Sequence, residues 1–405
     1  MTLTTEENEL LTRVGPGTPG GELLRRYWHP ISVARELTDE RPTKFIRFLG
    51  EDLVLFKDKS GNVGLIQDHC AHRGASLLYG RVEERGIACA YHGWLYDTNG
   101  NCLETPAEPV DSKFHLTVRA TAYPVQSLLG VLWIYMGPAP APVIPPYDFL
   151  MRKGRPRVTI TQPVLHCNWL QCVENNVDPT HAPILHQDHE NMRAKPVSTT
   201  RGFIDDQPGW GFYHVPYGIM KQRHFANGET DEHAFVFPNV LSQSTGRYMV
   251  PVDDEHTLLI IMGVPPHHGD AEPTDEDPEP VVEYTRPYKE PADRSYPFAR
   301  YQTRTIIQQD IMVWETQRPI QDRTLERLAT SDGAVVAMRE LMFENLEKVR
   351  RGEDPLGVIR DPNHPIVETG VGDLNQTGGQ TGRGRPYGIT TGTVSQQLPA
   401  GARGA

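Results

Sequence analysis

Two cysteine–histidine pairs in the N-terminal third of the chain have a spacing suited to metal chemistry. Cys70 and His72 form a C-x-H pair, and Cys89 and His92 form a C-x2-H pair after sixteen intervening residues. This spacing suits a [2Fe–2S] cluster with two thiolates on one iron and two imidazoles on the other. Neutral imidazoles remove negative charge and raise the reduction potential to roughly −150 to +300 mV, against about −400 mV for an all-cysteine ferredoxin. The four residues therefore predict one-electron transfer.

Zinc is the alternative occupant of this site, but zinc-binding loops usually open with C-x2-4-C rather than C-x-H. Gly74 and Gly93 each follow closely on a histidine, as expected if backbone N–H groups approach bridging sulfides without side-chain obstruction. The segments HCAHRGASLLYGR and CAYHGWLYDTNG around the two pairs closely resemble the Rieske signature. The resemblance favours a Rieske [2Fe–2S] cluster over zinc.

The stretch NWLQCVENNVDPTHAPILH contains a second set of candidate ligands, Asp178, His181 and His186. Two histidines and one carboxylate on one face suit a mononuclear iron and leave positions open for O2 and substrate. Five residues of a regular α-helix turn a side chain about 140° away from its starting face. Pro183 interrupts the helical ladder between the histidines. We therefore expect a widened turn of the π type to bring His181 and His186 together.

Each of these residues also has a structural explanation. Asp178 before Pro179 is a good helix N-cap with proline at N1, and a single histidine is more often a surface or core residue than a ligand. Taken together, however, the run resembles the E-N-x-x-D-x-x-H-x4-H motif of Rieske non-haem iron oxygenases. The resemblance extends over roughly residues 5 to 350 and implies that His181 and His186 bind iron.

A third iron ligand must be a carboxylate farther along the chain. In RTIIQQDIMVWETQ, Asp310 shares a helical face with Ile311 and Trp314. A buried ionised carboxylate is costly unless it is paired or metal-bound. Glu315 is expected to point elsewhere and Asp322 to cap the next helix. The resemblance places the last ligand at Asp310; a salt bridge to a buried arginine is the alternative.

The chain length predicts two or three domains, because a domain commonly has about 100–200 residues. We expect an α+β fold with four segments: a helical segment at 1–40 packed on the catalytic part, an antiparallel β Rieske domain at 41–140, a catalytic domain at 141–368 and a low-complexity tail at 369–405. The catalytic domain should have an antiparallel sheet crossed by helices at 168–190, 300–328 and 332–351. These boundaries follow from strand-like runs, from a proline-rich linker at 138–147 and from changes in composition.

Composition narrows the environment and the partners. The net charge of −12 disfavours nucleic acid and anionic membranes, and the longest apolar run is too short to span a bilayer. The N-terminal residues show no export signal. Cys102, Cys167 and Cys172 remain after the cluster ligands and predict free thiols in a reducing cytoplasm.

The segments around the cluster and Asp310 are similar to those of the phthalate 4,5-dioxygenase group. The departure is Ala71, where proline is usual. The resemblance implies a homotrimer in which Asp178 joins His181 to His92 of the neighbouring subunit, so that an electron crosses a subunit boundary. It also implies a separate NADH-dependent flavin and iron–sulfur reductase, because no G-x-G-x-x-G motif stands here in a strand-to-helix context.

The resemblance implies an aromatic-ring-hydroxylating oxygenase active in the breakdown of aromatic compounds. The expected reaction is dihydroxylation or diaryl-ether cleavage of an aromatic carboxylate, and the alternative is O-demethylation of an aromatic ether by monooxygenation. A Rieske electron carrier with a docking domain is the hypothesis from another class, and it leaves the second ligand set unexplained. We expect an arginine to bind the substrate carboxylate. Arg223 is favoured over Arg201 and Arg247 because its neighbours alternate less like an exposed strand.

Overall fold

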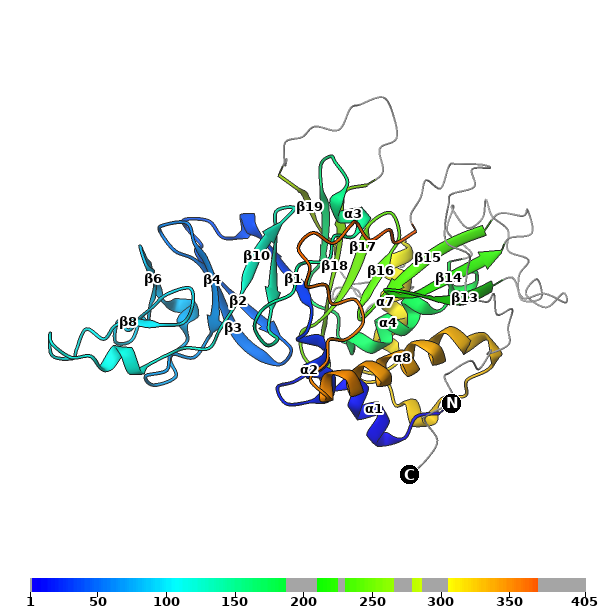
Figure 1. Ribbon diagram of the computed structural model, residues 1–405, viewed down its shortest axis with the longest axis horizontal. Coiled ribbons are helices and arrows are strands. Elements are labelled where there is room, and N and C mark those ends of the chain that lie inside the picture. The colour runs from blue at the N-terminus through cyan, green and yellow to red at the C-terminus, as the bar shows by residue number, and fades with distance from the viewer. Residues whose placement is uncertain (1, 187–209, 225–229, 266–278, 286–304, 371–405) are drawn as a thin grey trace, which may run out of the picture.

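The computed structural model describes residues 2–186, 210–224, 230–265, 279–285 and 305–370. A β-rich part occupies one end of the molecule, and a part with a large sheet and most helices occupies the other (Figure 1). The helices are α1 (Thr5–Thr12), α2 (Pro19–Leu24), α3 (Asp148–Met151), α4 (Trp169–Val177), α5 (His181–Leu185), α7 (Ile306–Thr316) and α8 (Gly333–Arg350). Short 3-10 turns are η1 (Ala34–Glu36), η2 (Leu77–Tyr79), η3 (Phe114–Thr117), η4 (Arg323–Leu325) and η5 (Thr330–Asp332).

The β-rich part has three antiparallel sheets built from short strands. One sheet has the order β1 (Trp28–Val33), β11 (Val131–Tyr135), β10 (Val125–Leu128). The next has the order β2 (Thr43–Phe48), β3 (Glu51–Lys57), β4 (Val63–Gln67), β9 (Ala122–Tyr123). The third has the order β5 (Arg81–Glu83), β6 (Gly86–Ala88), β7 (Leu95–Tyr96), β8 (Cys102–Glu104). An antiparallel β domain was expected for this region.

The other part is organised by an eight-stranded sheet. Its order is β13 (Trp210–Val215), β14 (Gly218–His224), β15 (Thr230–Val236), β16 (Val240–Ser242), β17 (Gly246–Pro251), β18 (Thr257–Gly263), β12 (Arg157–Thr161), β19 (Val281–Thr285). The sheet is mixed rather than wholly antiparallel, because β12 pairs parallel with β19. The strand β12 lies between β18 and β19 in this order. It pairs antiparallel with β18 and parallel with β19.

The helices of this part differ in extent from two of the three expected segments. The described part of the segment 168–190 forms two short helices, α4 and α5, and in the described part of 300–328 the helix α7 ends at Thr316. The third helix, α8, matches the expected 332–351 closely. Asn168 begins α4, and its side chain accepts a hydrogen bond from Leu170 N. Helix α4 packs on β15, β16 and β17 and also contacts α7 and α8, so it connects the sheet to the helical layer.

The N-terminal segment is helical only in part. Helix α1 contacts α4, and helix α2 contacts α8. The side chain of Asn168 donates a hydrogen bond to Thr12 O. Residues 28–33, expected within a helical segment, instead form β1 and pair with β11. All six residues of β1 are buried, and a strand in the sheet pairs their backbone groups while burying both faces.

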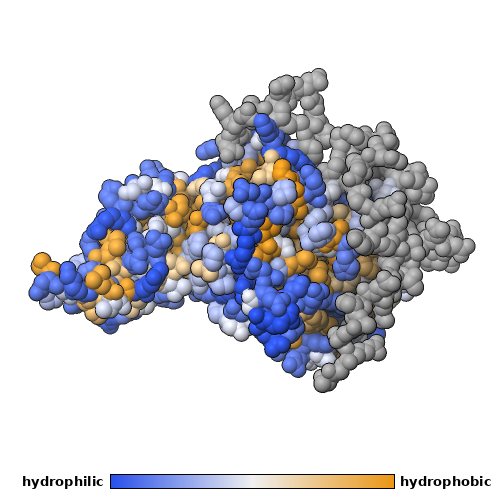
Figure 2. Space-filling view, viewed as in Figure 1, coloured by the Kyte–Doolittle hydropathy of each residue, from blue (hydrophilic) through white to orange (hydrophobic). Residues whose placement is uncertain are grey.

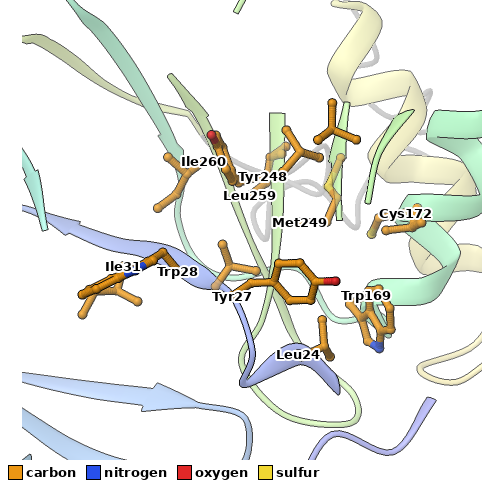
Figure 3. Close-up of a cluster of buried hydrophobic side chains, with 14 of the residues drawn as sticks. Leu24, Tyr27, Trp28, Ile31, Trp169, Cys172, Tyr248, Met249, Leu259 and Ile260 are labelled. Atoms are coloured by element: carbon orange, nitrogen blue, oxygen red, sulfur yellow. The ribbon is translucent and has the colours of Figure 1, made fainter. Parts of the chain in front are cut away.

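Two hydrophobic cores correspond to the two parts of the molecule. Figure 3 shows part of the larger core, where Tyr27 from the N-terminal segment, Trp169 of α4 and Met249 of β17 lie together. The smaller core fills the β-rich part and includes Cys70 and Cys89. Among the described residues, no helix is both long enough and apolar enough to cross a membrane. The expected tail lies outside the described residues from position 371 onward.

Candidate metal centres

The four residues of the first predicted site come together at the end of the β-rich part. Cys70 and Cys89 are each 3% exposed and belong to its core. His72 is exposed, and its Nδ1 lies 3.1 Å from Nδ1 of His92. Two imidazoles that aim the same nitrogen at one point can bind a single iron, while the thiolates face the interior. The histidine side of such a cluster would therefore be the side from which electrons leave.

The glycines of the two loops close tight turns. Gly74 and Gly93 both have φ of 73°, in the left-handed region that favours glycine. Their N–H groups donate to the backbone carbonyls of Cys70 and Cys89, at 2.8 and 2.9 Å. Each glycine thus closes the turn that presents its cysteine and histidine together.

Aromatic residues surround the ligand histidines. The indole of Trp94 stacks on His72 with a centroid distance of 4.4 Å and an interplanar angle of 11°. The ring of Tyr91 lies 3.8 Å from that of His92, and Arg73 lies over Tyr91 at 5.5 Å. The Tyr96 hydroxyl lies 3.3 Å from Cys70 Sγ. Burial raises the pKa of Tyr96, and the nearby Cys70 raises it further, so the hydroxyl stays protonated and can donate to the thiolate.

The second predicted set also converges. The ligand atoms of His181, His186 and Asp310 all lie within 4.8 Å of one another. Asp310 Oδ1 is 3.1 Å from His186 Nε2 and 3.7 Å from His181 Nε2. The two imidazole rings are almost perpendicular, at 84°. Two nitrogens and one carboxylate oxygen thus surround a space of the size that one metal ion needs.

The predicted π-type turn between the histidines is wrong. His181 is the first residue of α5, and His186 follows the last residue of that helix. The His186 N–H donates to Ala182 O, which is the ordinary α-helical bond. Helix α5 is a single turn, and His186 leaves it with φ −100° and ψ 11°. The backbone at the helix end therefore turns the His186 ring toward His181, so no inserted residue is needed.

Asp178 both caps the turn before α5 and orients His181. Asp178 Oδ1 accepts hydrogen bonds from the backbone N–H and the hydroxyl of Thr180, both at 2.7 Å, while Oδ2 accepts from His181 N at 3.1 Å. Oδ2 also lies 3.3 Å from His181 Nδ1. Burial would raise the pKa of Asp178, but the bonds from His181 and Thr180 lower it to about 2. The carboxylate is therefore ionised at every physiological pH.

The surroundings of Asp310 fit a metal ligand. It is 2% exposed, and its Oδ1 has no hydrogen-bond partner. Arg247 Nη1 lies 3.7 Å from Oδ2, too far for a hydrogen bond, so the salt-bridge alternative satisfies the carboxylate only in part. An unpaired buried carboxylate is costly, and a divalent ion between Oδ1 and the two imidazoles would remove this cost. Burial lowers the pKa of His181, which favours the neutral form that a metal requires.

The other carboxylates considered from the sequence lie outside this group. Glu315 accepts a hydrogen bond from His166 N, and Asp322 caps η4 by accepting from Thr324 N. Both therefore behave as expected. Gln309, which the motif did not single out, brings Oε1 within 2.6 Å of His186 Nδ1. The sequence feature that could have indicated this role is its position directly before Asp310.

A charged cluster lies on the sheet beside this centre. Arg223 is paired with Asp231 on the neighbouring strand, and Lys221 Nζ donates to Asp178 O at 3.2 Å. Burial lowers the pKa of Lys221 to about 7 and that of His233 to about 3. Sequence reasoning missed Lys221, although Lys221 and Arg223 alternate with neutral residues in β14. Arg201 lies outside the described residues.

The opposite side of the metal group opens to the surface. A cavity of about 420 Å³ lies between α4, α5, α7 and the region before α8. Asp178 and His181 line it together with Asn175, Val313 and Trp314. The side chains of Asp178 and His181 are 19% and 18% exposed, so a molecule docked in this cavity could touch them. We name this hollow the outer cavity.

Comparison with known proteins finds similarity over most of the chain. The family described as "Rieske [2Fe-2S] domain" matches residues 27–122, and "LigXa C-terminal domain like" matches residues 301–369. The chain is 39% identical to the 5,5'-dehydrodivanillate O-demethylase oxygenase subunit of Sphingobium sp. (strain NBRC 103272 / SYK-6), over 89% of this chain and 84% of that protein. It is 33% identical to the phthalate 4,5-dioxygenase oxygenase subunit of Pseudomonas putida, over 88% and 89%.

A solved structure has the same fold. The oxygenase in a complex of oxygenase and ferredoxin of carbazole 1,9a-dioxygenase superposes with a TM-score of 0.60 at 18% identity. The match covers 90% of this chain and all of that one.

Proposed function

This chain belongs to the Rieske non-haem iron oxygenases, and from that premise we propose that it is the terminal oxygenase of a multicomponent system that hydroxylates an aromatic carboxylate. It is an oxidoreductase whose cofactors are a [2Fe–2S] cluster and a mononuclear iron. The observation that carries the proposal is the presence of two convergent ligand groups in one chain, one with two histidines beside two cysteines and one with two histidines beside a buried aspartate.

The residues divide between the two cofactors as follows. Cys70, Cys89, His72 and His92 hold the cluster, with the thiolates in the core and the imidazoles at the surface. His181, His186 and Asp310 hold the mononuclear iron, which supplies the site at which O2 and substrate react. Burial favours the neutral form of the His181 imidazole by lowering its pKa, and the fold holds Asp310 away from water. A Rieske electron carrier without a second iron would leave Oδ1 of this buried carboxylate without a hydrogen-bond partner.

We propose that the enzyme works as a homotrimer in which Asp178 carries electrons between subunits. In one subunit, the sheet β5–β8 and helices α4 and α7 lie on opposite sides of β1 and β10 (Figure 1). Asp178 opens instead to the outer cavity, where His92 of a second subunit could reach it. Large side chains are exposed on the β-rich part, and Figure 2 shows orange surface at its tip. The exposed residues include Tyr79, Tyr91, Val110, Phe114 and Leu116.

The charged cluster on the sheet supports an anionic substrate. Three basic side chains lie on the sheet beside this centre: Lys221 and Arg223 are buried, and Arg247 is half-buried. Asp231 pairs with Arg223. A guanidinium fork matches a carboxylate bidentately. Arg223 has an unpartnered buried Nε as well as its bond to Asp231, and remains our proposed substrate contact. Arg247, which contacts Asp310, is the second candidate.

O-demethylation of an aromatic ether is the alternative reaction. It is favoured by the 39% identity to an O-demethylase oxygenase subunit, against 33% to a phthalate 4,5-dioxygenase oxygenase subunit. Phthalate and dehydrodivanillate, the compounds in the two names, are both aromatic carboxylates. The same charged cluster on the sheet would therefore suit either substrate. The two reactions differ in how many oxygen atoms of O2 enter the organic product.

One experiment tests the substrate class and the reaction together. Purified enzyme with a surrogate NADH-dependent reductase is offered phthalates, phenoxybenzoates and methoxybenzoates, and substrate-dependent NADH oxidation is measured. The masses of the products formed under 18O2 are then measured by mass spectrometry. Two labelled oxygen atoms indicate dioxygenation, and one indicates monooxygenation. The absence of substrate-dependent NADH oxidation with every one of these acids would contradict the proposal. A separate NADH-dependent reductase and a cytoplasmic location stay predictions of the same hypothesis.

A further inference from the structure

The two histidines of the mononuclear centre have unlike partners on their outward ring nitrogens. His181 Nδ1 faces the charged carboxylate of Asp178 at 3.3 Å. His186 Nδ1 lies 2.6 Å from the neutral amide oxygen of Gln309. Both partner oxygens can only accept, so each Nδ1 must carry the proton. Each Nε2 then keeps its lone pair and faces Asp310.

The position of His186 explains why it needs such a partner. His186 stands after the last residue of α5, so the helical ladder does not continue through it. His186 is 3% exposed, and its ring reaches from the end of α5 to Asp310 of α7. Gln309 and Asp310 are neighbours in α7. The same turn of α7 thus supplies the carboxylate and the acceptor that aims His186 toward it.

We infer that Gln309 is a positioning residue for the mononuclear iron, fixing the tautomer and the ring orientation of His186. This inference rests on the proposed function, because it assumes that His186 Nε2 binds a metal. A carboxylate partner makes an imidazole a more basic metal ligand, whereas an amide holds the ring in place without adding charge. The centre therefore has one histidine, His181, with a charged partner on the side of Asp178 and the outer cavity, and a second, His186, held by the uncharged amide of Gln309.

The inference is tested by metal affinity rather than by turnover. Holoenzyme is stripped of mononuclear iron with a chelator that leaves the cluster absorption unchanged, and Fe(II) is titrated back anaerobically against a competing chelator. Gln309→Leu keeps the bulk of the side chain and removes the acceptor. We expect its dissociation constant for Fe(II) to rise about 10- to 100-fold. Gln309→Glu keeps an acceptor oxygen at the same reach, and we expect its affinity to stay within about threefold of the unmodified enzyme or to be tighter.

Gln308→Glu is the matched control, because Gln308 lies on the same turn, but its side chain accepts from Thr305 N at the helix cap. Glutamate serves equally well at that position, so Fe(II) affinity should change by less than about twofold. The thermal midpoint of the metal-free protein should be alike in all three variants. If Gln309→Leu loses its cluster spectrum, Gln309→Asn replaces it, since the shorter amide cannot span to His186.

Two results would overturn the inference: Gln309→Leu binding Fe(II) as tightly as the unmodified enzyme, or Gln309→Glu binding it as weakly as Gln309→Leu. Failure of the proposed function looks different. In that case the unmodified enzyme takes up no Fe(II) beyond its cluster, or His186→Ala binds Fe(II) with undiminished affinity.

Discussion

Asp310 Oδ1 lies 3.1 Å from Nε2 of His186, although one residue belongs to α7 and the other ends α5. At this distance the carboxylate and the imidazole are close enough to share one metal ion. The carboxylate is buried and Oδ1 has no hydrogen-bond partner. The arrangement is thus costly without a metal. Removing the charge of Asp310 is therefore expected not to destabilise the metal-free fold.

Replacing Asp310 by asparagine should abolish mononuclear iron binding while leaving the cluster intact. Because the substitution removes a buried charge, the metal-free variant should unfold at a temperature no lower than that of the metal-free parent. Iron analysis, cluster absorption and calorimetry measure the three quantities. Glu315→Gln on the same helix is the control and should keep its iron. A variant that retains stoichiometric iron would remove Asp310 from the ligand set.

Asp178→Asn should keep both metal centres and lose nearly all turnover. The amide retains much of the geometry around Thr180 but removes the charge between His181 and the outer cavity. In a single turnover, the reduced cluster should fail to reoxidise in the presence of substrate and O2. Normal reoxidation in this variant would exclude the proposed route. Because the pKa of Asp178 is about 2, titration of this residue should not appear in the pH profile of the parent enzyme above about pH 4.

His72→Cys should lower the reduction potential of the cluster and change its spectrum. A thiolate in place of a neutral imidazole adds negative charge to the cluster and stabilises the oxidised state. The shift should be of the order of hundreds of millivolts, toward the range of all-cysteine ferredoxins. Spectroelectrochemistry measures it, and EPR of the reduced protein reports the ligand change. A reduced EPR signal identical to that of the parent would contradict the assignment of His72.

Arg223→Gln and Arg247→Gln separate the two candidate substrate contacts. Loss of a charged hydrogen bond to a carboxylate should cost about 2 kcal/mol, roughly a thirtyfold rise in KM for an aromatic acid, with a smaller change in kcat. Arg223 is already paired with Asp231, so its loss also leaves Asp231 unpaired. Asp231→Asn therefore serves as the control for that indirect effect. If KM for every aromatic acid is unchanged in Arg223→Gln, this residue does not bind the substrate.

Glu174→Gln should destabilise the fold far more than it alters the metal centres. Glu174 accepts from Arg323 Nη2 at 2.7 Å and from Arg339 Nε at 2.8 Å, joining α4 to η4 and α8. Breaking a buried ion pair by removing one partner costs about 3–5 kcal/mol. Glu347→Gln breaks only an exposed pair with Arg350 and should cost less than about 1 kcal/mol. Chemical denaturation of the two variants measures the difference.

The pH dependence of this effect has a definite sign. Burial would raise the pKa of Glu174, but Arg323 and Arg339 lower it below its ordinary value. A group whose pKa is lower in the folded state stabilises the fold at pH values above its unfolded pKa of about 4.3. The stability difference between Glu174→Gln and the parent should therefore be constant near neutral pH and shrink as the pH falls below about 4. A difference that grows on acidification would contradict this explanation.

The grouping of Cys70, His72, Cys89 and His92 could be predicted from the sequence because each half of the proposed cluster site is local. Cys70 and His72 share one tight turn, as do Cys89 and His92, and a glycine in each loop permits the required backbone conformation. The amphipathic spacing of α7 likewise indicated that Asp310 is buried with Ile311 and Trp314. Local spacing and side-chain polarity carry this information, so no tertiary contact is needed to read it.

Tertiary structure decided the rest. The end of the single-turn helix α5, rather than a π-type turn, sets the direction of His186, and where such a short helix ends depends on what packs around it. The partner of Arg223 follows from the register of β14 with β15, and the closeness of Arg247 and Gln309 to the iron ligands follows from the packing of α5 and α7 near the sheet. Register and packing join residues distant in the chain, and local propensity does not encode such pairings.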